Sequence, residues 1–170
     1  MPRLLLLRHA TAERARPGAP DHERPLSDPG RADAAAIGET MAKLGERPDL
    51  VLSSTSQRTR QTWGLLHPEL PQAPEPRFLR ELYDGGNYLA ILQRDGGDAA
   101  SLLLIGHNPT IHELAMLLAD SSEAADGAPL RRGFPAAALA ILDLDGSWAD
   151  LRPGTARLTA FVRPHGGRGD

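Results

Sequence analysis

Histidine and arginine side chains follow three short apolar runs in this 170-residue chain. Arg8 and His9 follow the first run, Arg58 comes shortly after the second, and His107 follows the third. Guanidinium groups are permanently charged, planar donors that suit phosphate oxygens. Nearby positive charge lowers the pKa of a histidine, so a neutral imidazole among arginines can attack phosphorus without help from a metal or a lysine. The residue types therefore indicate a pocket for a tetrahedral dianion and covalent phosphoryl transfer.

The apolar runs are short and uninterrupted, which is typical of strands that are buried on both faces of a sheet. They span Leu4–Leu7, Asp49–Leu52 and Ser101–Ile105. Two later strands are predicted over Ala136–Leu142 and Arg157–Val162, and Phe78–Tyr83 fits either a short strand or an irregular crossing. The chain therefore holds at least five candidate strands.

Helical patterns separate these strands. We predict one helix from a Ser27 cap to Gly45, one from a cap within Ser53–Ser56 to about His67, one over Asn87–Arg94, and one capped by Asn108 with Pro109 in its first position. Asp120–Arg132 is rich in small and polar residues and is predicted to be a loop. Strands and helices thus alternate along most of the chain.

This alternation predicts an α/β fold: a three-layer sandwich with a mostly parallel central sheet and helices on both faces. In such sheets, ligands bind outside the carboxyl ends of the strands. We therefore expect His9, Arg58 and His107 to gather at one edge of the sheet. The helices that follow Ser54 and Asn108 would add positive dipole ends and free backbone N–H groups there.

Composition and charge exclude several classes of protein. The chain has no cysteine, so disulfide scaffolds, thiolate zinc sites and cysteine nucleophiles are excluded. A net charge of −3 argues against a nucleic-acid binder that works by bulk charge. The early apolar run Leu4–Leu7 is too short for a membrane span or a signal peptide, so we expect a cytoplasmic protein without a membrane partner. We expect one domain over residues 1–164 and a flexible tail over 165–170.

The residues around the three strand ends resemble the motifs of the histidine phosphatase (phosphoglycerate mutase-like) superfamily. The matching stretches are Arg8-His9-Ala10, Leu52–Thr62 and Gly106-His107-Asn108-Pro109. The segment Glu23–Gly30 is similar to the approach to the first helix in SixA-type phosphohistidine phosphatases. The resemblance covers residues 3 to 164 and implies a phosphoglycerate mutase-like fold. Two positions depart from the family pattern: Ala10 replaces a usual glycine, and Thr55 replaces a usual proline.

The resemblance also implies roles for individual residues. His9 would be the nucleophile, and Arg8, Arg58 and His107 would bind the phosphate group of the substrate. Glu81, in Leu79-Arg80-Glu81, is the family's candidate general acid, with water or a carboxylate on the Thr11–Leu26 loop as the alternative. No cofactor and no metal ion are expected.

The resemblance favours a metal-independent phosphatase that forms a covalent phosphohistidine and acts on protein phosphohistidine. Two alternatives remain: a small-molecule phosphomonoesterase on the same scaffold, and a phosphate-binding module that has lost catalysis. The partner would be a phosphorylated protein or a small phosphorylated metabolite. The oligomeric state is left open.

Side chains near the motifs have simpler expected roles. Arg58 and Arg60 lie two residues apart, near opposite faces of a helix, so only Arg58 is expected to reach the pocket. Arg24 is a candidate for the mouth of the pocket. His22 is expected on the surface, and His112 is expected to be structural.

Overall fold

The computed structural model describes residues 1–120 and 124–164. They form a six-stranded sheet in the order β3-β2-β4-β1-β5-β6. The strands are β1 (Arg3–Arg8), β2 (Leu50–Ser54), β3 (Arg77–Leu79), β4 (Ser101–Gly106), β5 (Leu139–Leu144) and β6 (Ala156–Val162). The first four strands pair in parallel, whereas β5 runs antiparallel to β1 and β6 antiparallel to β5. The predicted tail over 165–170 lies outside the described residues.

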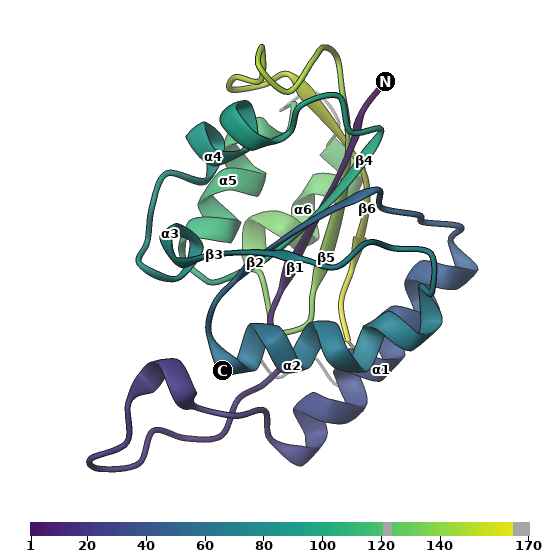
Figure 1. The fold of residues 1–170 in the computed structure, drawn as a ribbon. Coiled ribbons are helices and arrows are strands. Elements are labelled where there is room, and N and C mark those ends of the chain that lie inside the picture. The colour runs from purple at the N-terminus through teal and green to yellow at the C-terminus, as the bar shows by residue number, and fades with distance from the viewer. Residues whose placement is uncertain (121–123, 165–170) are drawn as a thin grey trace.

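Helices cover both faces of the sheet, which confirms the three-layer α/β architecture (Figure 1). One face packs against α1 (Asp28–Lys43) and α2 (Gln57–Leu66), and the other against α4 (Tyr88–Asp95), α5 (Thr110–Leu118) and α6 (Ala124–Arg132). Three single-turn elements lie at the periphery: the 3-10 turns η1 (Asp21–Glu23) and η2 (His67–Glu69) and the short helix α3 (Arg80–Tyr83). No helix of residues 1–120 or 124–164 is long and apolar enough to cross a membrane.

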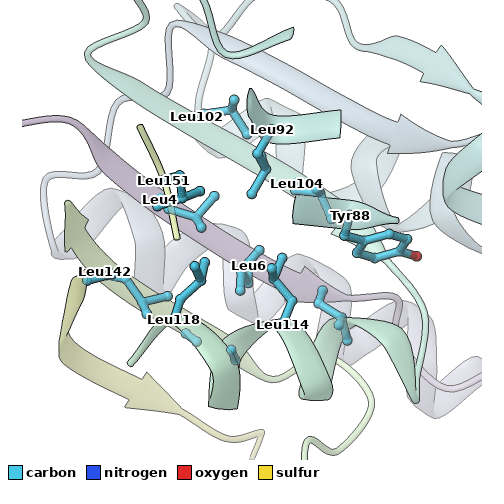
Figure 2. Packing of buried hydrophobic residues seen from close by; sticks show 14 of the residues in the cluster. Leu4, Leu6, Tyr88, Leu92, Leu102, Leu104, Leu114, Leu118, Leu142 and Leu151 are labelled. Atoms are coloured by element: carbon cyan, nitrogen blue, oxygen red, sulfur yellow. The ribbon is translucent and has the colours of Figure 1, made fainter. Parts of the chain in front are cut away.

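The unbroken apolar run of β1 follows from its central place in the sheet. Leu4 and Leu6 pack in the core beneath α4 and α5, as Figure 2 shows, whereas Leu5 and Leu7 pack in the core beneath α1 and α2. All four side chains are fully buried. Burial of each leucine side chain contributes about 2 kcal/mol, so β1 is firmly anchored and its carboxyl end is held in place.

Side-chain caps begin three of the predicted helices. Ser27 Oγ accepts from Gly30 N at 3.1 Å, and Ser56 Oγ accepts from Thr59 N at 3.3 Å. Asn87 Oδ1 accepts from Ala90 N at 3.1 Å. Each cap satisfies a backbone donor that the first helical turn would leave without a partner, and confirms a predicted helix start.

The expected cap at Asn108 is wrong. Helix α5 begins at Thr110, with Pro109 in the cap position. Asn108 Nδ2 instead donates to the carbonyl oxygen of Phe134 at 2.8 Å. The side chain is therefore engaged by a distant segment rather than by its own helix.

The predicted loop Asp120–Arg132 is also wrong in its second half. Residues Ala124–Arg132 form α6, which includes Pro129. Leu130 is buried in the core, and its carbonyl oxygen accepts a hydrogen bond from His112 Nε2 at 2.7 Å. This packing stabilises a helix that the composition of the segment does not favour, and it gives His112 the expected structural role.

The segment Phe78–Tyr83, for which the sequence allowed a short strand or an irregular crossing, forms parts of two short elements. Strand β3 pairs in parallel with β2, and α3 follows immediately as one helical turn. Leu82 of α3 is fully buried in the core, which fixes the turn against the sheet.

Candidate active site

The carboxyl ends of β1 and β4 bring two histidines together. His9 directly follows β1 and His107 directly follows β4, and these strands are neighbours in the sheet. His9 N donates to the carbonyl oxygen of Gly106 at 3.2 Å. The two imidazole rings have centroids 5.1 Å apart and are tilted by 54°. Parallel pairing of two buried strands is therefore what places the histidines side by side.

Hydrogen bonding fixes the tautomer of His9. Its Nδ1 lies 2.7 Å from the carbonyl oxygen of Ala10, which can only accept. Nδ1 of the neutral ring therefore carries the proton, and Nε2 keeps its lone pair. Since His9 is only 4% exposed, the surrounding protein holds the ring in this orientation.

The surroundings also keep His9 neutral. Burial is the largest effect, and the charges of nearby guanidinium groups, first Arg8 and then Arg58, act in the same direction. Together they lower the pKa of His9 to about 3. An imidazole with this pKa has a lone pair ready for nucleophilic attack at neutral pH.

Arg58 comes from the first turn of α2 and is 6% exposed. Its Nη2 lies 3.5 Å from His107 Nδ1, and its buried Nε has no hydrogen-bond partner among residues 1–120 and 124–164. Arg60 lies elsewhere, because its Nε donates to the carbonyl oxygen of Thr55 and its guanidinium stacks over Phe78 at 3.8 Å from the ring centroid. Of the two arginines, the structure brings Arg58 to the histidines.

Arg8 is the last residue of β1 and lies at the same edge of the sheet. It is 9% exposed, and its Nη1 donates to the carbonyl oxygen of Phe134 at 3.2 Å. It contributes to lowering the pKa of both His9 and His107, which places its charge close to the two rings. We call Arg8, His9, Arg58 and His107 the strand-end cluster.

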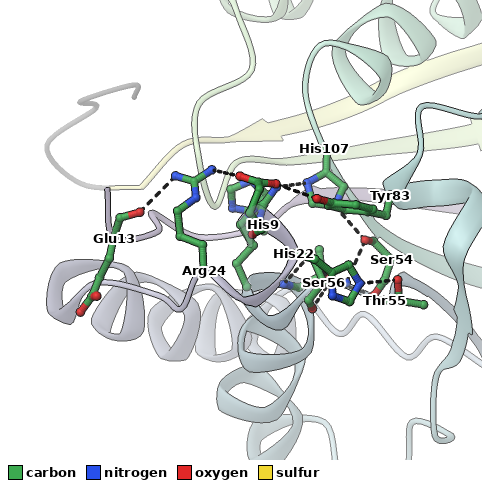
Figure 3. Close-up of polar contacts among 12 residues, drawn as sticks. His9, Glu13, His22, Arg24, Ser54, Thr55, Ser56, Tyr83 and His107 are labelled. Carbon is green, nitrogen blue, oxygen red and sulfur yellow. Dashed lines mark hydrogen bonds and ion pairs between the residues drawn. The ribbon is translucent and has the colours of Figure 1, made fainter. Parts of the chain in front are cut away.

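Two hydroxyl groups hold His107, one at its ring and one at its backbone. Its Nε2 lies 2.8 Å from Ser54 Oγ, at the end of β2, as Figure 3 shows. Its backbone N donates to the Tyr88 hydroxyl at 3.2 Å, and that hydroxyl donates to the carbonyl oxygen of Leu82. A Cβ at Gly106 would lie 2.8 Å from the same hydroxyl, so glycine permits this close approach. Burial and then the neighbouring His9 and Arg58 lower the pKa of His107 to about 3.

Arg58 can only donate, so the His107 nitrogen that faces it must accept. The neutral ring therefore carries its proton on Nε2 and donates it to Ser54 Oγ. The Ser54 hydroxyl also accepts from Ser56 N at 3.2 Å, and a hydroxyl can take either role toward an imidazole. Ser54 thus supports either tautomer of His107.

Comparison with known proteins identifies the family. The model of the histidine phosphatase superfamily, branch 1, matches residues 4–85. The candidate phosphohistidine phosphatase SixA of Agrobacterium tumefaciens is 35% identical, and its crystal structure matches with a TM-score of 0.78 over 95% of this chain and 98% of that one. The chain belongs to the histidine phosphatase superfamily. This result confirms the family, the phosphoglycerate mutase-like fold and the SixA-type branch that the motifs indicated.

Two further relatives agree with this placement. The candidate SixA structure from Nakamurella multipartitia is 33% identical, with a TM-score of 0.79 over 96% of each chain. An uncharacterized protein of Mycobacterium tuberculosis is 37% identical over 151 residues, which are 86% of this chain and 93% of the relative. This member of the histidine phosphatase superfamily is accordingly a phosphatase.

The Thr11–Leu26 loop, which the sequence offered as a source of an alternative carboxylate, places Asp21 beside the strand-end cluster. Asp21, in η1, accepts hydrogen bonds at Oδ2 from Arg58 Nη2 (3.2 Å) and from the Tyr83 hydroxyl (2.9 Å), and its Oδ1 pairs with Arg24 at 3.2 Å. Partial burial acts to raise the pKa of Asp21, but the hydrogen bond from Tyr83 and the charges of the two arginines hold it below its usual value. Asp21 is therefore a charged carboxylate at neutral pH.

Arg24 lies near the site as expected, whereas His22 is less exposed than expected. Arg24 lies beside the cluster through Asp21, and its Nη1 donates to the carbonyl oxygen of Glu13 at 3.1 Å. His22 was predicted on the surface, but it is partly buried, with Nε2 2.8 Å from Thr55 Oγ1 and its ring edge-on to Tyr83. The loop folds back on Thr55 and on α3, and these contacts cover part of His22.

The structure does not bring Glu81 to the strand-end cluster. Both carboxylate oxygens accept from Arg94, at 2.9 and 3.1 Å, and the side chain is half exposed. Glu81 and Tyr83 lie two residues apart on the single turn α3, so they point in different directions. Tyr83 faces His107 and Asp21, whereas Glu81 faces α4.

Two further features describe the surroundings of the site. The Glu13–Pro25 loop lines a cavity of about 200 Å³, with Asp21 and Arg24 in its wall. Within the described part of the chain, no three His, Asp or Glu side chains are grouped so that they could hold a metal ion.

Proposed function

We propose that this phosphatase hydrolyses phosphohistidine on proteins, with His9 as the nucleophile. The observation that carries the proposal is the orientation of His9: its Nδ1–H is held by the Ala10 carbonyl, which leaves the Nε2 lone pair for attack. A histidine nucleophile and a phosphorylated protein as partner fit the SixA-type relatives.

The reaction has two balanced steps. In the first, His9 Nε2 forms a bond to phosphorus while the bond from phosphorus to the substrate nitrogen breaks, and the electron pair stays on that nitrogen. In the second, water attacks the phosphohistidine, phosphate is released, and His9 regains its lone pair. Both steps depend on positioning and on stabilising the charge of the transferring group.

Arg8, Arg58 and His107 would bind the phosphoryl oxygens. Arg58 offers a permanently charged group whose buried Nε has no hydrogen-bond partner in the described part of the chain. A phosphoryl oxygen only accepts, so His107 must present a proton on Nδ1, the nitrogen that faces Arg58. Ser54 makes this possible, because its hydroxyl can turn and donate to Nε2 at a separation of 2.8 Å.

The carboxylates favour a leaving group that needs little help from an acid. Asp21 is held charged by two arginines and Tyr83, and Glu81 is paired with Arg94. An alkoxide leaving group is strongly basic and needs a proton, usually from a positioned acid worth 10²- to 10⁴-fold in rate. The imidazole of phosphohistidine can leave already protonated at its distal nitrogen. This difference supports phosphohistidine over alkyl phosphates.

The test is a substrate panel that compares a phosphohistidine protein with sugar phosphates and nucleotides. We expect the highest kcat/KM for the phosphohistidine protein and a phosphoenzyme that is labile in acid and stable in alkali, as a P–N bond is. Activity should be unchanged in EDTA. A sugar phosphate that outcompetes phosphohistidine would replace the proposed substrate, and loss of activity in EDTA with recovery on adding a divalent ion would contradict the mechanism.

A further inference from the structure

The Asp21 carboxylate binds the guanidinium groups at the phosphoryl site. Its Oδ2 accepts from Arg58 Nη2 at 3.2 Å and from the Tyr83 hydroxyl at 2.9 Å, and its Oδ1 lies 3.2 Å from Arg24 Nη2. In Figure 3, Arg24 and Tyr83 approach this contact from opposite sides. Donors from three separate segments therefore converge on one side chain.

A phosphoryl group bound by Arg58 would meet this carboxylate at the same guanidinium group. Arg58 Nη2 lies 3.2 Å from Asp21 Oδ2 and 3.5 Å from His107 Nδ1, so a single nitrogen faces both the carboxylate and His107. Two anions that share one donor lie within a few ångströms of each other and repel, and the repulsion is stronger in a partly buried site than in water. The charged carboxylate and a phosphoryl group therefore compete for Arg58.

We propose that the Asp21 carboxylate is a built-in competitor for the phosphoryl site, which the substrate displaces from Arg58 and Arg24 and which helps to expel the product phosphate. Competition weakens every phosphoryl ligand by the same factor. A protein substrate offsets this loss through contacts outside the pocket, whereas free phosphate has no such contacts. The carboxylate thus limits product inhibition. This inference rests on the proposed binding of phosphoryl groups by Arg58, and it is independent of the leaving group.

The loop gives the displaced carboxylate room to move. The Asp21 side chain is 51% exposed, and the loop between β1 and α1 extends away from the sheet (Figure 1). The carbonyl oxygen of Asp21 separately accepts from Arg58 Nη1 at 3.0 Å, so η1 keeps a contact with Arg58 when the carboxylate leaves. Rotation of one side chain is enough for the exchange, and the buried cluster does not need to rearrange.

The test is calorimetric titration of the full chain with inorganic phosphate. Asp21→Asn keeps the size of the side chain but removes its charge, and we expect phosphate to bind on the order of 10-fold more tightly, as befits the loss of two partly exposed ion pairs. Glu23→Gln is the matched control, because it removes a charge from the same turn, and Glu23 makes no ion pair or side-chain hydrogen bond with the described residues. Unchanged or weaker binding by Asp21→Asn, or equal tightening by Glu23→Gln, would overturn the proposal.

A second variant acts on the same contact from the other side. Tyr83→Phe keeps the ring but removes the hydroxyl that donates to Asp21 Oδ2, and we expect phosphate to bind about 2- to 3-fold more tightly. If thermal unfolding shows that Asp21→Asn does not fold, Tyr83→Phe becomes the deciding variant. Phosphate affinity equal to that of the wild type in Tyr83→Phe would then reject the proposal that Asp21 competes for the phosphoryl site. Phosphate binding can be measured without turnover. If Asp21→Asn binds phosphate more tightly but the wild-type protein does not hydrolyse phosphohistidine, only the proposed substrate is rejected.

Discussion

The two histidines and Arg58 of the strand-end cluster are at most 8% exposed, whereas the two nearby carboxylates, Asp21 and Glu81, are about half exposed. Arg8, His9 and His107 lie at the ends of buried strands and Arg58 lies in the first turn of α2, so the sheet and this helix set the geometry of the cluster. The carboxylates sit on single-turn elements at the periphery. Asp21 points toward Arg58, whereas Glu81 points toward Arg94. The comparison separates a buried cluster, which we propose as the reaction centre, from an exposed periphery.

Removal of the nucleophile should have the largest effect. His9→Ala should lower kcat on every substrate on the order of 10⁴-fold or more, because no covalent intermediate can form. The fold should survive, since the residue lies at a strand end and outside the apolar clusters. Rapid-quench labelling should detect no phosphoenzyme. Normal turnover by a folded variant would show that the reaction centre lies elsewhere.

Removal of a phosphoryl-binding donor should have the next largest effect. Arg58→Ala or His107→Ala should each lower kcat/KM on the order of 10²- to 10³-fold, because each removes a preorganised donor to the transferring group. Arg60→Ala is the matched control on the same helix, and it should cost less than about 3-fold. Similar losses for Arg58→Ala and Arg60→Ala in steady-state assays would contradict the division between buried cluster and periphery.

Ser54 supports the cluster without belonging to it. Ser54→Ala should lower kcat/KM about 10-fold, because it leaves a buried nitrogen of His107 without its partner. Nitrogen-15 NMR of the free protein should show the His107 proton on Nε2 in the wild type, and addition of phosphate should move it to Nδ1. Ser53→Ala removes a neighbouring hydroxyl that donates to a backbone carbonyl, and it should leave the His107 signals unchanged. No phosphate-dependent change in the wild type would argue against this role.

Acid should destabilise the buried cluster. His9 and His107 each have a pKa of about 3 in the folded protein and about 6.5 when unfolded, so between these values the unfolded chain binds protons that the folded chain does not. The free energy of unfolding should therefore fall as the pH is lowered from about 6.5 toward 3, by up to about 1.4 kcal/mol per pH unit for each imidazole. Urea unfolding at several pH values measures this slope, and it should be shallower in His9→Gln. An equal slope in both proteins would reject the assignment.

Glu81 should matter least. Glu81→Gln should change kcat/KM less than about 3-fold on a phosphohistidine protein, on p-nitrophenyl phosphate and on an alkyl phosphate, because its carboxylate pairs with Arg94 in an exposed position. A loss of 10²-fold or more confined to the alkyl phosphate would restore Glu81 as the general acid and would move it from the periphery into the reaction.

Much of the fold could be predicted because its patterns are local. The run Leu4–Leu7 is apolar throughout since both faces of β1 are covered, and capping residues such as Ser27 and Ser56 mark helix starts through bonds to their own first turns. Helix α6 could not be predicted, because it depends on burial of Leu130 and on a hydrogen bond from His112, eighteen residues earlier.

The sequence by itself determined the residues that we propose as reacting groups and the edge of the sheet where they meet. Arg8 ends β1, His9 and His107 directly follow β1 and β4, and parallel pairing must bring these strand ends together. Tertiary structure decided which carboxylate joins them. Asp21 reaches Arg58 across 37 residues through a loop without periodicity, and Glu81 is turned away by the single helical turn that aims Tyr83 inward. Strand ends are located by a repeating hydrogen-bond ladder, whereas the direction of a loop side chain depends on distant contacts that no local pattern encodes.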